Sequence, residues 1–223
     1  ISEPNATHAL ERAQRDILAI AQDQSKSGEH DTPKLVSEYL AKLDDSIGNP
    51  NAMMGIKTNY SSLDNTLKGL HRANIIILAA RPSVGKTSMA VCIARHVAVD
   101  TEMPVGIFSL EMSAAALVQR LIHIEAGVSR DDAKDNIEEI SNAASRIADA
   151  PLFIDDRSGL SVQQITAAAR RMKQQHKIRL LVIDYLQLIR STRDRGSRND
   201  EVTEISSGCK GLAKELNIPI ILV

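Results

Sequence analysis

The stretch Ala80-Arg81-Pro82-Ser83-Val84-Gly85-Lys86-Thr87 follows the apolar run 75–79 and precedes a helical pattern that begins at Ser88. This order predicts a strand, a phosphate-binding loop and a helix. In such a loop the backbone N–H groups point into a concavity at the helix N-terminus, where the helix dipole favours an anion. The stretch differs from the general pattern G-x-x-x-x-G-K-[ST] at Ala80, which stands in place of the first glycine. The flanking patterns therefore carry the prediction.

The loop is expected to hold the phosphates of a nucleotide. Lys86 should reach the β- and γ-phosphates, and the Thr87 hydroxyl should bind Mg²⁺. The alternative is a chance match between two ordinary loops, against which the strand and helix patterns on either side argue. The residues of this stretch that we predict to bind the nucleotide are Arg81, Ser83, Val84, Gly85, Lys86, Thr87 and Ser88.

Apolar runs of strand length alternate with helical patterns along the rest of the chain. Strands are predicted at 104–110, 152–154, 178–184 and 218–223, helices at 34–47, 113–126, 161–176 and 200–216, and one or two further helices within 131–148. Because helices of crossover length separate the strands, the predicted fold class is α/β, with a mostly parallel sheet covered by helices on both faces. Ligands of such sheets bind at the carboxyl ends of the strands.

Shorter signals refine this picture. A short helix is expected between Thr58 and Asp64, before the first strand. Ser161 and Gln164 have the spacing of a capping box, which marks the start of a helix. The basic residues of that helix, Arg170, Arg171 and Lys173, are interpreted as a solvated face.

Two acidic residues follow predicted strands and should share the carboxyl edge with the loop. Asp184 comes after four apolar residues, as a Walker B acid does, and such a carboxylate can hold the Mg²⁺ shell beside the phosphate loop. Glu111 is a candidate general base that positions water for attack on the γ-phosphate. Its alternative role is to stabilise the N-terminus of the helix that begins near Ser113. The transferred phosphoryl group also needs a cation, for which Arg81 and Arg120 are the nearby candidates.

The N-terminal region is predicted to stand apart from the α/β domain. Residues 7–22 place apolar side chains at helical spacing with charged residues opposite, which indicates an amphipathic helix. Residues 23–33 are polar and have the composition of a flexible linker. We therefore assign 1–33 to a linker helix with its flexible linker and 34–223 to the nucleotide-binding domain. The helix must bury its apolar stripe on its own domain or on a neighbouring subunit.

Composition narrows the classes of function. The chain is 43% hydrophobic and 25% charged, and its net charge of −1 gives no global field that would attract a polyanion. The loop 190–198 is locally basic, and its arginines contact a phosphate backbone or lie in solvent. These arginines are Arg190, Arg193, Arg195 and Arg198. Because Trp is absent and aromatic residues make up 2% of the chain, base-stacking platforms are not expected.

The cysteines, the histidines and the lengths of the apolar runs argue against disulfide-bonded, zinc-binding and membrane proteins. Cys92 and Cys209 are not in a C-x-x-C pair, and we interpret them as reduced thiols of a cytoplasmic protein. The six histidines lack metal-ligand spacing, so no zinc site is expected. No apolar run approaches the ~20 residues of a membrane span, and no signal peptide is visible. We expect a cytoplasmic protein without a membrane partner.

Four motifs occur in an order that is specific to one family. They are 80–87 (Ala-Arg-Pro-Ser-Val-Gly-Lys-Thr), 108–113 (Phe-Ser-Leu-Glu-Met-Ser), 183–188 (Ile-Asp-Tyr-Leu-Gln-Leu) and 212–219 (Leu-Ala-Lys-Glu-Leu-Asn-Ile-Pro). Together they resemble the DnaB-type replicative DNA helicase, specifically its RecA-like C-terminal motor domain, which is a P-loop NTPase. The resemblance extends from about Gly55 onward. Ala80 agrees with it, because the family itself reads A-R-P-S-x-G-K-T.

The resemblance implies an ATP-driven motor that assembles as a hexameric ring, with ATP at subunit interfaces and single-stranded DNA in the central channel. ATP and Mg²⁺ are the implied cofactors, and a primase and a helicase loader are the implied partners. Lys86 and Glu111 are the implied catalytic residues, with Glu111 as the base. Thr87 and Asp184 would bind Mg²⁺, and Arg120 would lie against the nucleotide base.

The same resemblance assigns roles to the two flanking features. The helix 7–22 is similar to the family's linker helix, which docks on the adjacent motor domain, and this implies a homo-oligomer. The loop 190–198 matches the position of a channel-facing loop, which favours DNA contact over a purely solvated loop.

The chain begins at Ile1 rather than Met and ends at Val223, so we expect a piece of a longer protein. The family's sensor glutamine, trans-acting arginine finger and second DNA loop would lie beyond Val223. We therefore expect this piece to bind ATP but to hydrolyse it slowly alone, and hydrolysis at the rate of an intact hexamer would refute that expectation. Two other functions stay open: a RecA-like ATPase of recombination or of a regulatory ring without unwinding, and a nucleotide-dependent assembly module without catalysis.

Overall fold

The computed structural model describes residues 31–47, 55–81, 83–184 and 198–223. The chain divides into two compact units, Ile1–Ala52 and Met53–Val223. The described part of the first unit is helix α2 (Thr32–Ile47), which confirms the helix predicted at 34–47 and starts it two residues earlier. The helix predicted at 7–22 lies outside the described residues, and the division of the chain at 33/34 stays a prediction.

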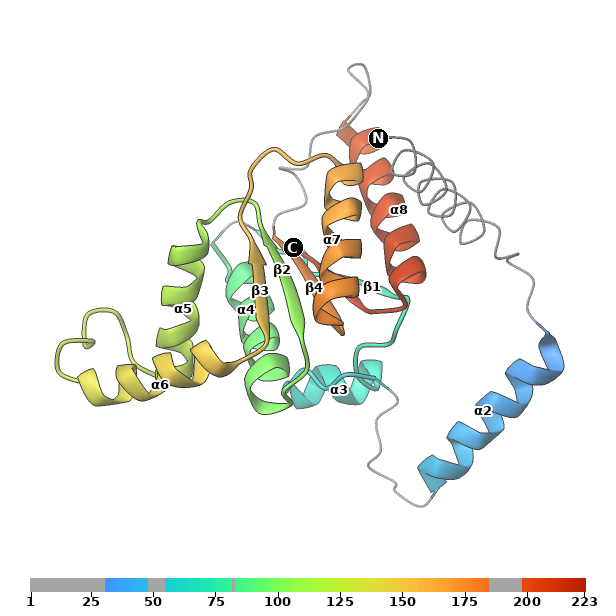
Figure 1. Ribbon diagram of the computed structural model, residues 1–223, viewed down its shortest axis with the longest axis horizontal. Coiled ribbons are helices and arrows are strands. Elements are labelled where there is room, and N and C mark those ends of the chain that lie inside the picture. The colour runs from blue at the N-terminus through green and yellow to red at the C-terminus, as the bar shows by residue number, and fades with distance from the viewer. Residues whose placement is uncertain (1–30, 48–54, 82, 185–197) are drawn as a thin grey trace, which may run out of the picture. The chain divides into compact units, whose positions relative to one another are not determined.

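The second unit is built on a parallel five-stranded sheet (Figure 1). Its strands are β1 (Ile75–Ile77), β2 (Val105–Ser109), β3 (Leu152–Asp155), β4 (Leu180–Asp184) and β5 (Ile220–Leu222). They lie in the order β1-β5-β4-β2-β3, and every neighbouring pair is parallel. Because β2 and β4 are neighbours in register, the residues that follow them lie at one edge. The structure confirms the predicted parallel α/β sheet, although β1, β2, β4 and β5 are shorter than the apolar runs that predicted them, and β3 extends one residue further.

The helices of this unit connect the strands as crossovers, except α3, which precedes β1. They are α3 (Ser61–Leu67), α4 (Lys86–Arg95) with its π-helical continuation η1 (His96–Asp100), α5 (Ala114–Ala126), α6 (Ile137–Asp149), α7 (Val162–His176) and α8 (Arg198–Leu216). The predicted capping box is present at the start of α7: Ser161 Oγ accepts from Gln164 N at 3.3 Å, and Gln164 Oε1 accepts from Ser161 N at 2.9 Å. The helix predicted from 131 begins only at Ile137, because a turn occupies the preceding residues.

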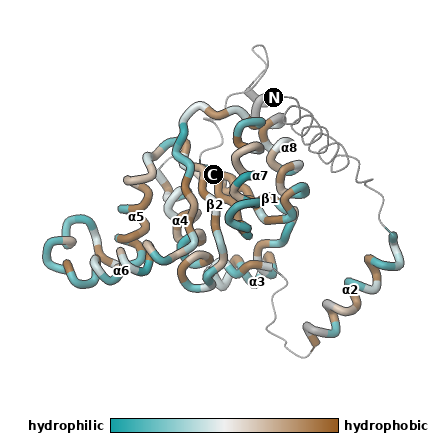
Figure 2. The backbone as a smooth tube through the Cα atoms, viewed as in Figure 1, coloured by the Kyte–Doolittle hydropathy of each residue, from teal (hydrophilic) through white to brown (hydrophobic). Residues whose placement is uncertain are grey.

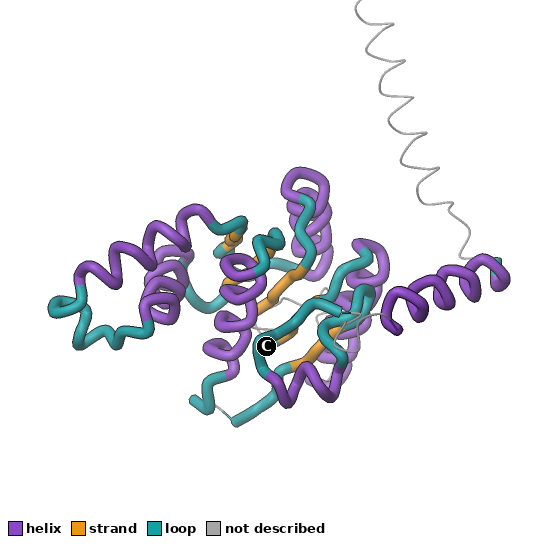
Figure 3. Tube along the Cα trace, turned by 90° about the horizontal axis from the view of Figure 1, so that it is seen from below, coloured by secondary structure: helices purple, strands orange, loops and turns teal. Residues whose placement is uncertain are grey.

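The sheet has an apolar core on each face. Alternate residues of a strand point to opposite faces, so Leu181 and Ile183 of β4 pack with α7 and α8, whereas Leu180 and Val182 pack with α4 and α5. Figure 2 shows the strands as apolar segments, and Figure 3 shows them between helices. Burial on both faces explains why the strands are continuous apolar runs in the sequence.

The basic face of α7 agrees in part with the solvated face that we predicted. Arg170 forms two hydrogen bonds to the Glu215 carboxylate of α8, with Nε–Oε1 2.5 Å and Nη2–Oε2 2.8 Å. Lys173 is half-buried and donates to the Ile178 carbonyl at 2.8 Å. Arg170 and Arg171 are exposed as predicted, so the prediction was wrong only for Lys173, whose acceptor lies in the segment after α7 and is not revealed by the helical pattern. Among the described helices, none combines the length and apolar character that crossing a bilayer requires.

Candidate functional site

The loop between β1 and α4 contains two residues with positive φ and leads into the N-terminus of α4. Gly85 is the N-cap of α4 and has φ of 100°, a conformation that favours glycine. Ser83 also has a positive φ, of 63°, whereas Ala80 does not. The first position of the pattern therefore needs no glycine in this chain, which gives a physical reason for the departure seen in the sequence. Pro82 lies outside the described residues.

The first two side chains of α4 form hydrogen bonds with residues of the predicted nucleotide site. Lys86 Nζ donates to the Ala80 carbonyl at 3.1 Å, so the ammonium group lies over its own loop. Thr87 Oγ1 donates to Asp184 Oδ1 at 3.3 Å across 97 positions of sequence. This contact joins the start of α4 to the carboxyl end of β4. The structure thus brings together the two residues that were predicted to share Mg²⁺.

Asp184 is a buried carboxylate with little compensation from the protein. Asp184 is only 5% exposed. Burial raises the pKa of Asp184 above its ordinary value, the Thr87 hydrogen bond opposes that rise, and the charge of Glu111 adds to it. A hydroxyl and a carboxylate oxygen are the hard donors that Mg²⁺ prefers, and Mg²⁺ is commonly held by one or two carboxylates plus phosphates. The donor set therefore fits this cation.

Glu111 lies two residues beyond β2, next to Asp184. Ser109 is the register partner of Asp184, and Leu110 N donates to the Asp184 carbonyl at 2.6 Å. Ser109 Oγ donates to the Met112 carbonyl at 2.7 Å and so fixes the turn that carries Glu111. Within the described residues, the exposed Glu111 carboxylate makes no hydrogen bond or ion pair. Its position is fixed while its carboxylate stays available.

The alternative role for Glu111, at the N-terminus of α5, is filled by other residues. Ser113 Oγ accepts from Ala116 N at 3.3 Å, and Asp156 Oδ2 accepts from Ala114 N at 2.8 Å. Ser113 and Asp156 therefore satisfy two of the four orphan N–H groups that a helix start presents. This assignment favours a chemical role for Glu111.

Sequence reasoning missed the supporting roles of Ser109 and Asp156. The signal for Asp156 was its place directly after a strand, at the same edge as Glu111 and Asp184. The hydroxyl of Ser109 had no signal in the sequence, because its acceptor is a backbone carbonyl in a turn.

The structure describes some of the arginines that were predicted to bind nucleotide or DNA and not others. Arg120 of α5 is half-buried, and its positive charge lowers the pKa of Asp184, so it faces the site. Arg81 is exposed in the phosphate loop. The basic-loop residues Arg190, Arg193 and Arg195 lie outside the described residues. Arg198 is the first residue of α8, and its side chain is not described.

This fold and this site define a class of protein. A parallel sheet with a phosphate loop after β1, and with acids after β2 and β4 at the same edge, is the arrangement of RecA-like P-loop nucleotide-binding domains. The family model described as "DnaB-like helicase C terminal domain" matches residues 55–223. The chain therefore belongs to the family of DnaB-like helicase C-terminal domains.

Individual relatives agree with this family. The chain is 34% identical over 226 residues to the replicative DNA helicase DnaC of Bacillus subtilis (strain 168), covering 98% of this chain and 50% of the relative. It is 38% identical over 202 residues to the replicative DNA helicase DnaB of Rickettsia prowazekii (strain Madrid E), covering 83% and 42%. The chain thus spans about half the length of the curated relatives it matches.

Solved structures that are similar to the chain include the following two. One is described as an ATPase domain, and it aligns with a TM-score of 0.75 and 28% identity, covering 84% of this chain and 69% of that one. The other is a DnaB-like replicative helicase, studied with its interactions with primase. It aligns with a TM-score of 0.73 and 27% identity, covering 95% and 52%. These likenesses confirm the RecA-like fold.

Replacing Asp184 by asparagine should stabilise the nucleotide-free chain and impair its site. The neutral amide can keep the Thr87 contact without the cost of a desolvated charge, so we expect a higher unfolding temperature, by about 2–4 °C for each kcal/mol gained. The same change should weaken Mg²⁺-dependent nucleotide binding, because a carboxylate ligand is lost. Thermal unfolding with and without ATP and Mg²⁺ measures both effects. Asp149→Asn, at the exposed end of α6, is the matched control. A lower unfolding temperature for D184N without ligand contradicts this account.

Proposed function

We propose that this chain is part of the motor of a replicative DNA helicase, which hydrolyses ATP at subunit interfaces to move along single-stranded DNA and unwind duplex. Membership of the DnaB-like family supports the proposal, as do the printed names of the relatives. The observation that carries it is the convergence of Thr87, Asp184 and Glu111 at the carboxyl edge of the sheet, beside the phosphate loop. A replicative role also predicts that the protein works in the cytoplasm.

The geometry suggests how each residue would contribute. The backbone N–H groups of 83–87 would cradle the phosphates at the N-terminus of α4, and Lys86 would exchange its contact with the Ala80 carbonyl for the β- and γ-phosphates. A bound Mg²⁺ would neutralise charge that develops on the phosphates. Thr87 and Asp184 would hold it. ATP use fits the family, and the Mg²⁺ assignment rests on this donor set.

Glu111 would act on the attacking water. Its exposed carboxylate lies beside the Asp184 strand end, where it can accept a proton from water aligned with the γ-phosphate. Arg120, which faces the same edge, would lie against the nucleotide. Both roles are proposals that the position of these side chains supports.

The proposed partners are single-stranded DNA, other copies of the chain in a hexameric ring, a primase and a helicase loader. The arginines of 190–198 would contact the DNA backbone, by charge rather than by base recognition. One of the similar solved structures was described with its interactions with primase, which supports a primase as partner here.

The first unit offers a surface for assembly. Helix α2 exposes an apolar stripe, in which Leu35 is 47%, Tyr39 55% and Leu40 54% exposed. These side chains repeat at helical spacing, so they form one apolar face of the helix. Exposing such a face to water costs free energy, which burial against a partner would recover. The predicted linker helix 7–22 belongs to the same unit. We propose that this unit contributes to contacts between copies.

Replacing both Leu35 and Leu40 by serine should weaken self-association of the parent protein, by which we mean the longer protein of which this chain is expected to be a piece. The two exposed side chains contribute little to the fold of their own unit, so the unfolding temperature should stay within the range of ordinary surface changes, while the assembled species loses its apolar contact. Light scattering coupled to size exclusion measures the mass at several protein concentrations. Lys34→Ser in the same helix is the control. An unchanged mass distribution for the double variant contradicts this role.

The proposed function is tested by nucleotide turnover of the parent protein. We expect ATP hydrolysis that rises when single-stranded DNA is added, because a translocating motor couples each turnover to its track. An assay of released phosphate, with and without an oligonucleotide, measures this. Turnover that is absent, or that ignores DNA at low salt, contradicts a DNA motor.

A further inference from the structure

A cavity of about 380 Å³ lies at the opposite edge of the sheet from the phosphate loop. Its lining comes from the segments that lead into β1, β2, β4 and β5: Arg72, Met103, Arg179 and Asn217, each within three positions of its strand. Because the strands are parallel, these segments meet at the amino edge. The other lining residues are Gly55, Ile56, Leu70, Lys173 and Leu216. The nucleotide site uses none of them.

Three cations converge on this cationic cavity without acidic partners. Arg72 and Arg179 are exposed, and Lys173 is half-buried on the last turns of α7. Within the described residues no carboxylate forms an ion pair with any of the three. Burial lowers the pKa of Lys173, and the charges of Arg179, Arg72 and Lys177 lower it further. The cations therefore repel one another, which costs stability unless an anion binds between them.

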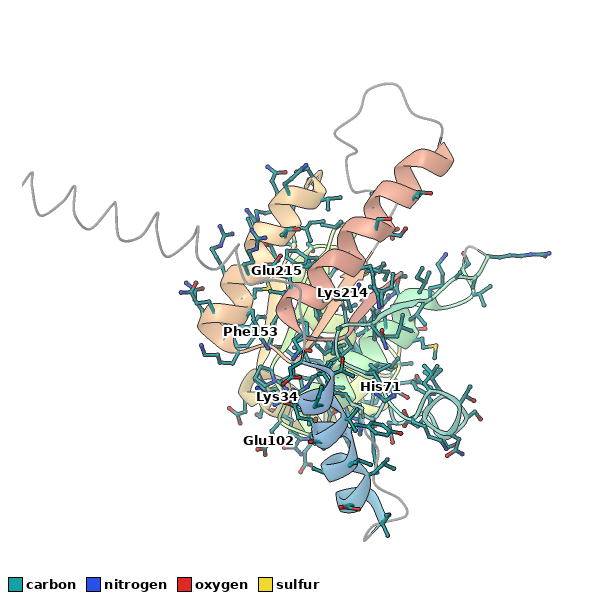
Figure 4. The ribbon with its side chains drawn as sticks, turned by 90° about the vertical axis from the view of Figure 1, so that its right-hand side faces the viewer. Lys34, His71, Glu102, Phe153, Lys214 and Glu215 are labelled. Atoms are coloured by element: carbon teal, nitrogen blue, oxygen red, sulfur yellow. The ribbon has the colours of Figure 1, made fainter. Side chains whose placement is uncertain are left out.

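Two acids adjoin lining residues in the sequence, Glu102 and Glu215, and neither pairs with a cation of the cavity. Glu215 precedes the lining residue Leu216 in the sequence, and both its oxygens are taken by Arg170. Glu102 precedes Met103 and is exposed, with no ion pair in the described part of the chain. Figure 4 labels three side chains that adjoin lining residues in the sequence: His71, Glu102 and Glu215.

The two helices that end here do not balance the charge. α7 ends at His176 and α8 at Leu216, so both present C-terminal carbonyl groups to this edge. Each helix end is equivalent to roughly −0.5 charge, so two ends offset about one of the three positive charges. Lys173 already bonds a carbonyl here, at Ile178. A net positive charge of about two remains for a ligand.

The wall of the cavity is built from paired backbone. Ile56 N donates to the Leu70 carbonyl at 3.0 Å, and Leu70 N donates to the Ile56 carbonyl at 2.7 Å. A Cβ at Gly69, where φ is 82°, would lie 2.7 Å from the Gly55 carbonyl carbon, so the two backbones can approach only with glycine. The apolar residues Ile56, Leu70 and Met103 line the same cavity as the cations. Such apolar lining suits the organic part of a ligand.

From this arrangement we propose that the cationic cavity binds a small phosphate-bearing anion of the pyrophosphate or nucleoside-phosphate class. Guanidinium groups match phosphate oxygens in bidentate fashion, and the volume lies at the lower end of ligand sites, which suits a small molecule rather than a helix or strand. The site is separate from the phosphate loop, so a ligand there would regulate the domain rather than be its substrate.

Pyrophosphate is the probe, and Lys86→Ala is the background, since it weakens competing binding at the phosphate loop. Calorimetric titration should show one binding event in this background. Adding Arg72→Gln and Arg179→Gln should weaken it at least about tenfold, the cost of removing charged hydrogen bonds. Arg130→Gln with Lys134→Gln removes the same charge from exposed positions away from the cavity and should leave it unchanged. Equal loss in both double variants, or no binding in the background, overturns the proposal.

Two further readouts separate binding from a structural role. If the cations repel one another, Arg72→Gln with Arg179→Gln should leave the ligand-free unfolding temperature unchanged or higher. A clear fall would show instead that these arginines stabilise the C-terminal ends of α7 and α8. An oligothymidylate titration distinguishes the source of phosphate. If the oligonucleotide binds through Arg72 and Arg179 while pyrophosphate does not, the ligand is a nucleic-acid backbone and the small-ligand proposal is wrong.

Discussion

Lys86→Ala should reduce the affinity of the chain for ATP by about 10- to 150-fold, because it removes a charge-assisted contact worth roughly 1.5–3 kcal/mol. The fold should be unaffected, since the Lys86 ammonium makes one exposed hydrogen bond, to the Ala80 carbonyl. Titration with a fluorescent ATP analogue in the presence of Mg²⁺ measures the change.

Lys134→Ala is the control for this variant, because it removes an exposed lysine outside the site. Its affinity should match that of the unchanged chain, and the unfolding temperatures of both variants should agree with it. If K86A binds ATP as tightly as the unchanged chain, the loop between β1 and α4 is not the nucleotide site.

Glu111→Gln should lower ATP turnover of the parent protein by about 10²- to 10⁴-fold, the usual contribution of a general base. ATP affinity should change little, because Glu111 lies beyond β2 and is not part of the phosphate loop. The amide keeps the size of the side chain but cannot accept a proton from water. Steady-state hydrolysis and separate nucleotide titration distinguish the two quantities.

Glu102→Gln is a matched control, since Glu102 is also an exposed glutamate next to β2 but precedes that strand, at the opposite edge. It should turn over ATP normally. Normal turnover by E111Q would show that Glu111 is not the general base and would leave it the alternative, structural role.

The fold was predictable because both faces of the sheet are buried. Buried parallel strands leave continuous apolar runs, and helices of crossover length between them allow few topologies. Element ends were less accurate, since apolar residues such as Leu78 lie just past β1 while still packing against the core. The start of α6 was missed for a related reason: the turn before Ile137 has helix-compatible residues.

The site was predictable to the extent that strand ends define it. Asp184 and Glu111 were assigned to one edge from the sequence, and the contact between Thr87 and Asp184 agrees with that placement. The choice between two roles for Glu111 required the structure, because the residues that cap α5 include Asp156, 42 positions from its partner Ala114.

The cationic cavity had no sequence signal at all. Arg72, Lys173 and Arg179 come from separate segments of the chain, and each alone resembles an ordinary solvated cation. Only the parallel topology, which gathers the amino ends of the strands, brings them together. Sites at that edge are therefore the part of such a fold that pattern reasoning is least able to find.

The most direct test of the central proposal, that this site powers unwinding, is a strand-displacement assay on the parent protein with a duplex carrying a 5′ single-stranded tail. We predict displacement with ATP and Mg²⁺, none with a non-hydrolysable ATP analogue, and none for Glu111→Gln. Hydrolysis of ATP without any displacement would contradict the helicase proposal and favour a RecA-like ATPase that does not unwind DNA.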